Sequence, residues 1–275
     1  MMTEIQPDEL QNRSPAEHDA AAYAVDQPND SIYSRIREVP MSAPFRWLAQ
    51  GWSDFRYNPG QSLFYGCCFA IAGFILGMVF NYAYQYVSTL TTSFLLLGPF
   101  LALGLYDVSR RHEQADSGLI PTILSLNGKF GNIGVFAAVL AVLMLLWARA
   151  SLVTFALFYS NDMPTLEGFL AQLLSAENLE FLTVYFCVGL TFASLVFAAS
   201  VVSIPLMLDR DTDAITAMLV SFGCMVRSLP TMMLWASLIV LLTVIGFATF
   251  YVGLIFTMPI IGHATWHAYR DCIAP

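Results

Sequence analysis

Apolar residues dominate this chain in long unbroken runs, not in the short periodic patterns of a soluble domain. A hydrocarbon core ~30 Å thick needs about 20 consecutive apolar residues per helical span. Six runs approach or exceed that length, covering residues 62–82, 88–106, 132–159, 180–208, 231–248 and 250–268. The sequence therefore predicts an all-α integral membrane protein with a six-span membrane domain over residues 41–271.

The last two spans lie within one stretch that carries no charge before Arg270 and is about twice as long as a single span requires. Gly246 and Gly253 lie in the middle of this stretch, on either side of Thr249. Glycine relaxes a helix and favours turns. We therefore expect a tight turn near residues 246–253 that separates the two spans.

Basic residues outside the spans gather on one side of the predicted membrane. They are Arg35, Arg37, Arg46, Arg56, Arg110, Arg111, Lys129, Arg210, Arg227 and Arg270. Basic loops face the cytoplasm, so this distribution predicts that both termini are cytoplasmic. Aromatic residues fall at both expected interfaces, and Trp52 and Trp266 are among those on the cytoplasmic side.

Residues 1–40 differ from the rest because they are polar, acidic and free of any long apolar run. We expect a disordered acidic tail in the cytoplasm. Composition supports the membrane assignment, since 57% of the residues are hydrophobic and only 12% are charged. The net charge of −8 argues against a nucleic-acid partner. The five cysteines form no C-x-x-C pair, so no disulfide framework is expected.

Three cytoplasmic segments share a pattern in which a basic residue lies three positions before a span. The pattern reads Arg56-x-x-Pro59, Lys129-x-x-Asn132 and Arg227-x-x-Pro230. The preceding residues are apolar at helical spacing: Leu48, Trp52 and Phe55; Ile120, Ile123 and Leu124; Ile215, Leu219, Phe222 and Val226. Such helices lie in the membrane interface with the basic residue near lipid phosphates. We predict three interfacial amphipathic helices that introduce three hairpins; three unrelated loops are the alternative interpretation.

Each even-numbered span carries a proline shortly before its cytoplasmic end, namely Pro99, Pro205 and Pro259. A proline in a transmembrane helix frees a backbone carbonyl and bends the helix. Three kinks at similar depth favour three similar hairpins. The middle hairpin has one addition, because residues 165–177 place leucines on one helical face and so predict an amphipathic helix on the outer surface.

His263 and His267 lie one helical turn apart near the end of the last span, and His112 follows the second span at the same membrane face. This spacing suits the ligands of one metal ion or of haem. Histidines beside Trp266 and Arg270 also serve as structural hydrogen-bonding groups at the level of the lipid headgroups. We favour the structural interpretation and predict no bound cofactor. Metal or haem binding stays an alternative.

Arg149 is the one cation inside a predicted span, and an ionisable residue there is a candidate functional site. Counted from Ile133 at 1.5 Å per residue, it lies ~24 Å along the helix, close to the outer boundary. It either snorkels to the interface beside Trp147 or pairs with an acidic residue, Glu167, Glu177 or Glu180. No nucleophile arrangement, phosphate-binding loop, H-E-x-x-H motif or catalytic carboxylate pair occurs, so we predict no enzyme.

The segments GPFLALGLYDVSRR, DRDTDAITAM and PIIGHATWHAYRD resemble the recurring motifs of a bacterial integral membrane family, the domain of unknown function 2189. The resemblance extends from about Trp47 to Arg270. It implies a protein of the bacterial inner membrane. Some relatives carry the label cytochrome c oxidase subunit I, but this chain lacks the full set of ligands for a haem-copper centre. The label therefore implies at most a respiratory-chain context.

Three functions follow from these observations. The first is a non-catalytic accessory or scaffold subunit that binds other membrane proteins or self-associates, because few polar groups lie inside the spans. The second is a transporter or channel for a small solute or a lipid, with a site among Pro99, Pro205, Pro259 and Arg149. The third is a metal or haem protein that uses His263, His267 and His112.

Overall fold

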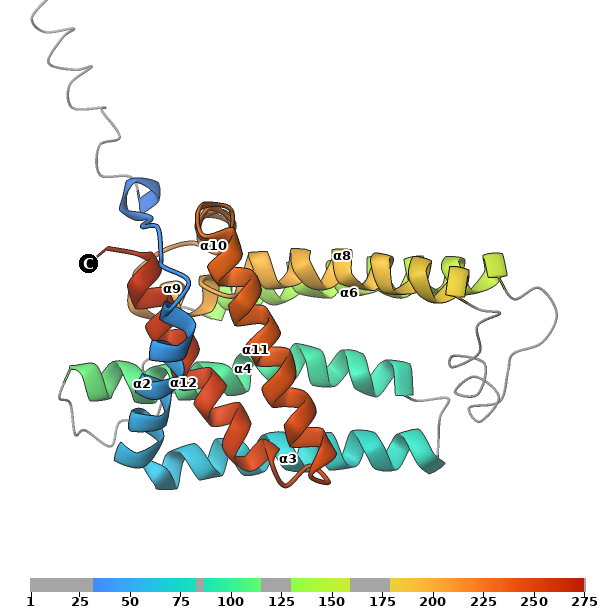
Figure 1. Cartoon of the computed structure of the whole chain (residues 1–275), viewed down its shortest axis with the longest axis horizontal. Helices are drawn as coiled ribbons and strands as arrows, with labels where there is room; N and C mark the ends of the chain where they lie inside the picture. The colour runs from blue at the N-terminus through green and yellow to red at the C-terminus, as the bar shows by residue number, and fades with distance from the viewer. Residues whose placement is uncertain (1–31, 83–86, 115–129, 159–178, 275) are drawn as a thin grey trace, which may run out of the picture. The chain divides into compact units, whose positions relative to one another are not determined.

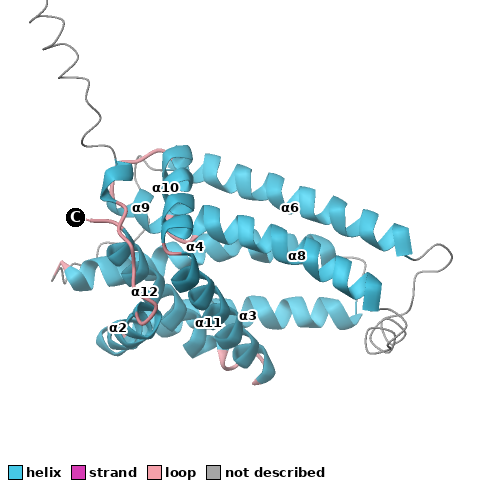
Figure 2. Cartoon of the chain, turned by 45° about the horizontal axis from the view of Figure 1, so that its top comes forward, coloured by secondary structure: helices cyan, strands magenta, loops and turns pink. Residues whose placement is uncertain are grey.

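The computed structural model describes residues 32–82, 87–114, 130–158 and 179–274, and helices make up most of them (Figure 1, Figure 2). The chain divides into two units, residues 1–35 and residues 36–275. Within the described part of the first unit lies one 3-10 helix, η2 (Ile32–Arg35). The described helices of the second unit are α2 (Ala43–Tyr57), α3 (Pro59–Tyr82), α4 (Val87–Glu113), α6 (Phe130–Phe158), α8 (Leu179–Ser200), α9 (Ser203–Asp209), α10 (Ala214–Arg227), α11 (Leu229–Ala248) and α12 (Leu254–Cys272).

Four segments among the described residues are long and apolar enough to cross a membrane. They are Pro59–Met78, Phe130–Phe158, Leu179–Asp209 and Leu229–Ala248. These correspond to the first, third, fourth and fifth predicted spans. The second and sixth predicted spans fall on α4 and α12, which are helical but are not among the four. The all-helical membrane architecture is thus confirmed, while six spans remain a prediction.

Consecutive long helices pack against each other as α3 with α4, α6 with α8, and α11 with α12. α6 and α8 run side by side in both views, and α11 and α12 cross them obliquely (Figure 1, Figure 2). The hairpin of α11 and α12 therefore differs in orientation from that of α6 and α8. The predicted outer helix of residues 165–177 lies outside the described residues.

α12 is the centre of the packing, because it contacts α2, α3, α4, α9 and α11. Two glycines allow this. A Cβ placed on Gly51 of α2 would lie 2.7 Å from the Ile260 carbonyl oxygen of α12, and a Cβ on Gly66 of α3 would overlap the Ile255 carbonyl oxygen. Pro259, inside α12, has no N–H to offer that Ile255 carbonyl. Gly66 thus lets α3 approach α12 where the proline interrupts its hydrogen bonding.

The turn predicted near residues 246–253 is confirmed, since α11 ends at Ala248 and α12 begins at Leu254. Phe250 and Tyr251 have φ of 55° and 67° there, a left-handed conformation that non-glycine residues seldom adopt. Tyr251 packs over Gly77 of α3, while Phe250 is 87% exposed. The turn thereby fixes the far end of the α11–α12 hairpin against α3.

The fourth predicted span is interrupted just before Pro205. α8 ends at Ser200, two turn residues follow, and α9 begins at Ser203. Pro205 cannot donate to the Val201 carbonyl four residues earlier, and this explains the break at that point. Leu206 N–H resumes the helical pattern by donating to the Val202 carbonyl at 3.0 Å.

Two of the three predicted amphipathic segments can be compared. α2 leads through Asn58 into α3, and α10 leads through Ser228 into α11. Both capping residues have similar backbone angles, with φ and ψ of −129° and 64° at Asn58 and −125° and 42° at Ser228. Each cap N–H donates to a carbonyl four residues earlier, that of Asp54 or Cys224. The third segment, with Lys129, lies outside the described residues.

The first residues of the second unit pair with the last. Ile36 and Ile273 form an isolated β-bridge, and Arg37 N–H donates to the Cys272 carbonyl at 2.8 Å. Val39 N–H donates to Ser228 Oγ at 2.9 Å. Residues 36–40, assigned above to the acidic tail, therefore have fixed partners in the structure.

Candidate functional site

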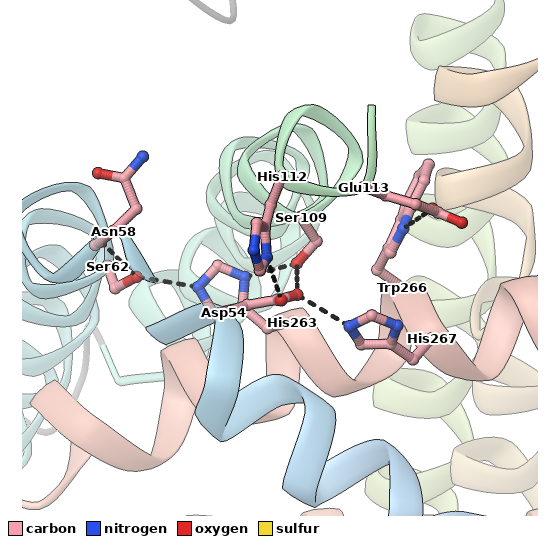
Figure 3. A network of polar contacts seen from close by, with 9 residues as sticks. All are labelled: Asp54, Asn58, Ser62, Ser109, His112, Glu113, His263, Trp266 and His267. Carbon is pink, nitrogen blue, oxygen red and sulfur yellow. Dashed lines mark hydrogen bonds and ion pairs between the residues drawn. The ribbon is translucent and has the colours of Figure 1, made fainter. Parts of the chain in front are cut away.

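The polar centre of the molecule is built around Asp54, a carboxylate on the buried side of α2 (Figure 3). Trp47, Gly51 and Asp54 follow one another at helical spacing on the face that packs against α12, and all three are buried. Gly51 brings the two helices close enough for the Asp54 side chain to reach across. Only 3% of Asp54 is exposed, so its charge requires partners within the protein.

Three side chains from two other helices donate to this carboxylate. From α4, Ser109 Oγ lies 2.7 Å from Asp54 Oδ2 and His112 Nδ1 lies 2.7 Å from Oδ1. From α12, His267 Nε2 lies 2.8 Å from Oδ2. Figure 3 shows the three donors converging on the two oxygens. Because each donor approaches a carboxylate, these are hydrogen bonds of the stronger, charge-assisted kind.

His263 extends the cluster to α3. It is fully buried, with its Nδ1 at 2.7 Å from Ser109 Oγ and its Nε2 at 3.0 Å from Ser62 Oγ (Figure 3). Ser62 Oγ in turn donates to the Asn58 carbonyl at 2.9 Å. We call Asp54, Ser62, Ser109, His112, His263 and His267 the polar cluster. It joins α2, α3, α4 and α12.

The electrostatics of the cluster favour an ionised Asp54. Burial alone would raise the pKa of the Asp54 carboxyl, but hydrogen bonds from His267, Ser109 and His112 outweigh burial, and the pKa lies below its usual value. His112 also stacks on Tyr57, with ring centroids 3.8 Å apart. The carboxylate and its donors therefore stabilise one another in a fixed arrangement.

A second group of polar contacts lies next to the cluster on α12. Trp266 Nε1 donates to Glu113 Oε2 at 3.0 Å, and Arg270 Nε donates to Glu113 Oε1 at 3.0 Å. Tyr269 donates through its hydroxyl to Asp209 Oδ2 at 2.6 Å. The sequence predicted Trp266 at the membrane interface; in the structure its side chain is 1% exposed within the protein, and its indole N–H has a partner on α4. Trp52, by contrast, is 45% exposed.

The three histidines named as candidate metal ligands do meet, but around Asp54. Asp54 occupies Nδ1 of His112 and Nε2 of His267, and two serines occupy both ring nitrogens of His263. Within the described ranges no group of three or more His, Cys, Asp or Glu side chains could hold a metal ion. The arrangement is that of a hydrogen-bonded structural cluster.

Asp54, Ser62 and Ser109 were not identified from the sequence. In residues 43–57 the helical spacing favoured the apolar stripe of Leu48, Trp52 and Phe55, of which the structure buries Phe55 and exposes Trp52. A signal for Asp54 existed, because it follows Gly51 by three positions and Trp47 by seven, on a face with one small and one large residue. Neither serine carried a comparable signal.

Residues next to the three prolines predicted to kink the spans line one cavity of about 260 Å³. Gly98, Ile204 and Met258, which directly precede Pro99, Pro205 and Pro259, all line it. Arg149 does not line it; its side chain is exposed on α6, and no ion pair with Glu180 is present. Glu167 and Glu177, the other predicted partners, lie outside the described residues.

The predicted interfacial residues that can be placed lie at the surface. Arg56 and Arg227, at the ends of α2 and α10, are both exposed, and Lys129 lies outside the described residues. The whole predicted apolar face of α10 is exposed, with Ile215 at 60%, Leu219 at 55%, Phe222 at 48% and Val226 at 64%. Its opposite face is buried through Ala217, Val220 and Cys224. α10 thus exposes the apolar face that the sequence predicted and packs its opposite face on the bundle.

The structure consists of long apolar helices, and a buried carboxylate and its donors hold helices together at one end. These features define an integral membrane protein of the all-helical class. The family model described as predicted integral membrane protein (DUF2189), the domain of unknown function 2189, matches residues 86–209. The resemblance is confirmed over this segment, which is shorter than the expected extent from Trp47 to Arg270. No curated protein and no solved structure matches the chain.

Proposed function

We propose that the protein is a non-catalytic accessory or scaffold subunit of the bacterial inner membrane. One observation carries the proposal: the buried ionisable side chains bond to one another across four helices. Asp54 is fully engaged by Ser109, His112 and His267, and His263 is engaged by two serines. A catalytic group must reach a substrate, whereas groups satisfied by one another rigidify a fold. The proposal includes no bound cofactor and no enzymatic reaction.

The surface supports a role in binding lipid and other membrane proteins. Leu219 and Phe222 of α10 belong to a continuous exposed apolar face, while the far side of the same helix is packed on the bundle. An apolar face beside exposed Arg227 suits a helix that lies at the membrane surface. Such a helix presents a collar at which a second membrane protein, or a second copy of this chain, can dock.

The proposal includes six spans with both termini in the cytoplasm. α4 and α12 are added to the four apolar segments because each lies beside one of them, α4 beside α3 and α12 beside α11. Fusion of a cytoplasm-active and a periplasm-active reporter to the C-terminus tests the topology. Activity of the periplasmic reporter would contradict an even number of spans with a cytoplasmic N-terminus. The resemblance to the family adds a respiratory-chain context.

Quantitative mass spectrometry of proteins that co-purify from native membranes in mild detergent tests the scaffold function. We expect stoichiometric membrane subunits with the wild-type chain. Leu219→Ser, on the exposed face of α10, should release them. Leu145→Ser, an equal change at a residue 63% exposed on α6, is the matched control and should retain them. A wild-type chain that purifies without any stoichiometric membrane protein would overturn the proposal.

A second candidate function, the transport or handling of a lipid, is favoured by the cavity at the three prolines. Its lining is almost wholly apolar, so a polar solute would lose its hydration there without replacement. Lipid is therefore favoured over a polar solute. A lipid flux assay in reconstituted vesicles tests it, and a flux equal to that of protein-free vesicles would exclude transport.

A further inference from the structure

The cavity of about 260 Å³ lies at the centre of the second unit, where α3, α4, α6, α8, α9, α11 and α12 all contribute to its wall. Phe69 of α3 and Leu140 of α6 face it from two sides, and Ile261 of α12 faces it from a third. An engineered apolar cavity of ~150 Å³ in a soluble protein stays free of water and binds benzene. This cavity is larger, so an apolar occupant is expected.

The chemistry of the wall excludes a polar ligand. Among the described residues that line it, the polar side chains are those of Tyr106, Ser200 and Thr265, and each is already paired within the protein. Ser200 donates to the Val196 carbonyl at 2.7 Å and Thr265 to the Ile261 carbonyl at 2.8 Å, both within their own helices. Tyr106 forms a side-chain hydrogen bond with Thr265. What remains is a surface of methyl, methylene and aromatic groups, which recognises hydrocarbon.

The lining residues extend along one helix. Those of α4 run from Gly98 to Tyr106, a rise of ~12 Å at 1.5 Å per residue. A cavity bordered over that length has room for a segment of an extended hydrocarbon chain.

A surface groove borders this cavity. The groove, of about 510 Å³, runs between α8 and α11 and is lined by the outward side chains of Leu190, Val240 and Leu241. Phe197 and Ile239 line both the groove and the central cavity. Since α8 and α11 both lie in segments apolar enough to span a membrane, the groove opens toward bilayer hydrocarbon.

We infer that one acyl chain of a membrane lipid enters the groove between α8 and α11, passes between Phe197 and Ile239, and occupies the central cavity. The headgroup stays outside, because the polar side chains among the described lining residues are already paired. The inference goes beyond the scaffold function, and it does not require transport, since a resident acyl chain can equally stabilise a scaffold. Co-purification and acyl-chain binding are therefore separate outcomes.

Photolabelling in vesicles tests the inference. The full-length protein is reconstituted in phosphatidylethanolamine and phosphatidylglycerol with a trace of phosphatidylglycerol carrying a diazirine in the middle of one acyl chain. After irradiation, mass spectrometry locates the labelled residues. We expect label on Leu105 and Ile261, which are 0% and 7% exposed and which the probe reaches only through the cavity. Label confined to outward residues such as Leu145 and Leu190 would overturn the inference.

Two variants and a control sharpen the result. Ala102→Phe fills the cavity, so labelling of Leu105 and Ile261 should fall about tenfold. Ala138→Phe makes the same change at an exposed position of α6 that lines neither space, and should leave that labelling unchanged. Phe197→Ala widens the space between Phe197 and Ile239 and should raise the labelling of Leu105 and Ile261. A decrease or no change in that labelling would contradict the entry route. This test holds even if Ala102→Phe fails to fold.

Discussion

Replacing the Asp54 carboxylate by an amide should destabilise the protein strongly. Asp54→Asn keeps the size of the side chain but removes the charge and turns one acceptor oxygen into an NH₂ donor. That donor then faces a hydroxyl or an imidazole N–H at 2.7 to 2.8 Å. At least one contact becomes repulsive, in a site only 3% exposed.

The magnitude follows from the burial and the number of partners. Breaking a buried charge pair by removing one member costs about 3–5 kcal/mol. We expect the lower end, ~3 kcal/mol, because the amide oxygen still accepts from one side. At ~2–4 °C per kcal/mol for a domain of this size, the melting temperature should fall by roughly 6–12 °C.

The assay is thermal unfolding in mild detergent, followed by tryptophan fluorescence, with Asp213→Asn as the matched control. Asp213 is the N-cap of α10, where its carboxylate accepts from Thr216 N–H at 3.0 Å, and asparagine caps a helix equally well. The control should therefore melt with the wild type. A shift for Asp54→Asn no larger than that of the control would refute the argument that this carboxylate holds four helices together.

Three further outcomes are expected. Gly66→Ala should lower the stability by about 1–3 kcal/mol, because the added Cβ meets a carbonyl of α12. Gly60→Ala is the control: its Cβ would have no atom within 4 Å, so this change should be neutral or slightly stabilising. Equal melting temperatures of the two variants would contradict the close approach of α3 and α12. The stability should fall as the pH drops from about 4 through the folded-state pKa of Asp54, because a carboxyl whose pKa is depressed by folding stabilises the fold only while it is ionised. The melting temperature, measured as a function of pH, should show this slope in the wild type and a shallower slope in Asp54→Asn. Ser228→Ala leaves the buried Val39 N–H without its partner, so it should cost about 1–3 kcal/mol and speed hydrogen exchange at Val39, and unchanged exchange would disprove the contact.

The membrane helices could be predicted because hydropathy is a local property. Each run of apolar residues becomes a helix wherever its neighbours lie, and the glycines at 246 and 253 marked the turn between the last two. The break before Pro205 followed for the same reason, since the missing N–H acts within one turn. The number of spans could not be derived from hydropathy in the same way, because α4 and α12 mix apolar residues with the polar side chains of the cluster.

The polar cluster could be predicted only in part. His263, His267 and His112 were expected on one membrane face, and in the structure they lie in one cluster. Asp54, the common partner of His112 and His267, lies 213 residues before His267, and nothing local indicates that pairing. It depends on α2 packing on α12, which Gly51 permits.

The assignment of two side-chain surroundings, on α2 and on α12, also shows what the sequence alone could not predict. Periodicity assigned Leu48, Trp52 and Phe55 of α2 to the membrane, but a helix with apolar residues on two sides gives no sign of which side meets protein. Trp266 was assigned to the interface for its residue type, and its hydrogen bond to Glu113 of α4 could not be foreseen from that. In both cases only residue type and spacing could be read from the sequence, and the packing of the helices determined which side chains are buried.

The distance along the chain between Asp54 and its donors has a consequence for biosynthesis. Synthesis adds about 5–20 residues per second, so roughly 10–40 s separate the appearance of Asp54 from that of His267, 213 residues later. During that interval α2 cannot settle on α12, and the carboxylate has at most its two donors from α4. The earliest helix of the second unit is therefore the last to find its place, and insertion of the intervening spans is complete before the fold can close.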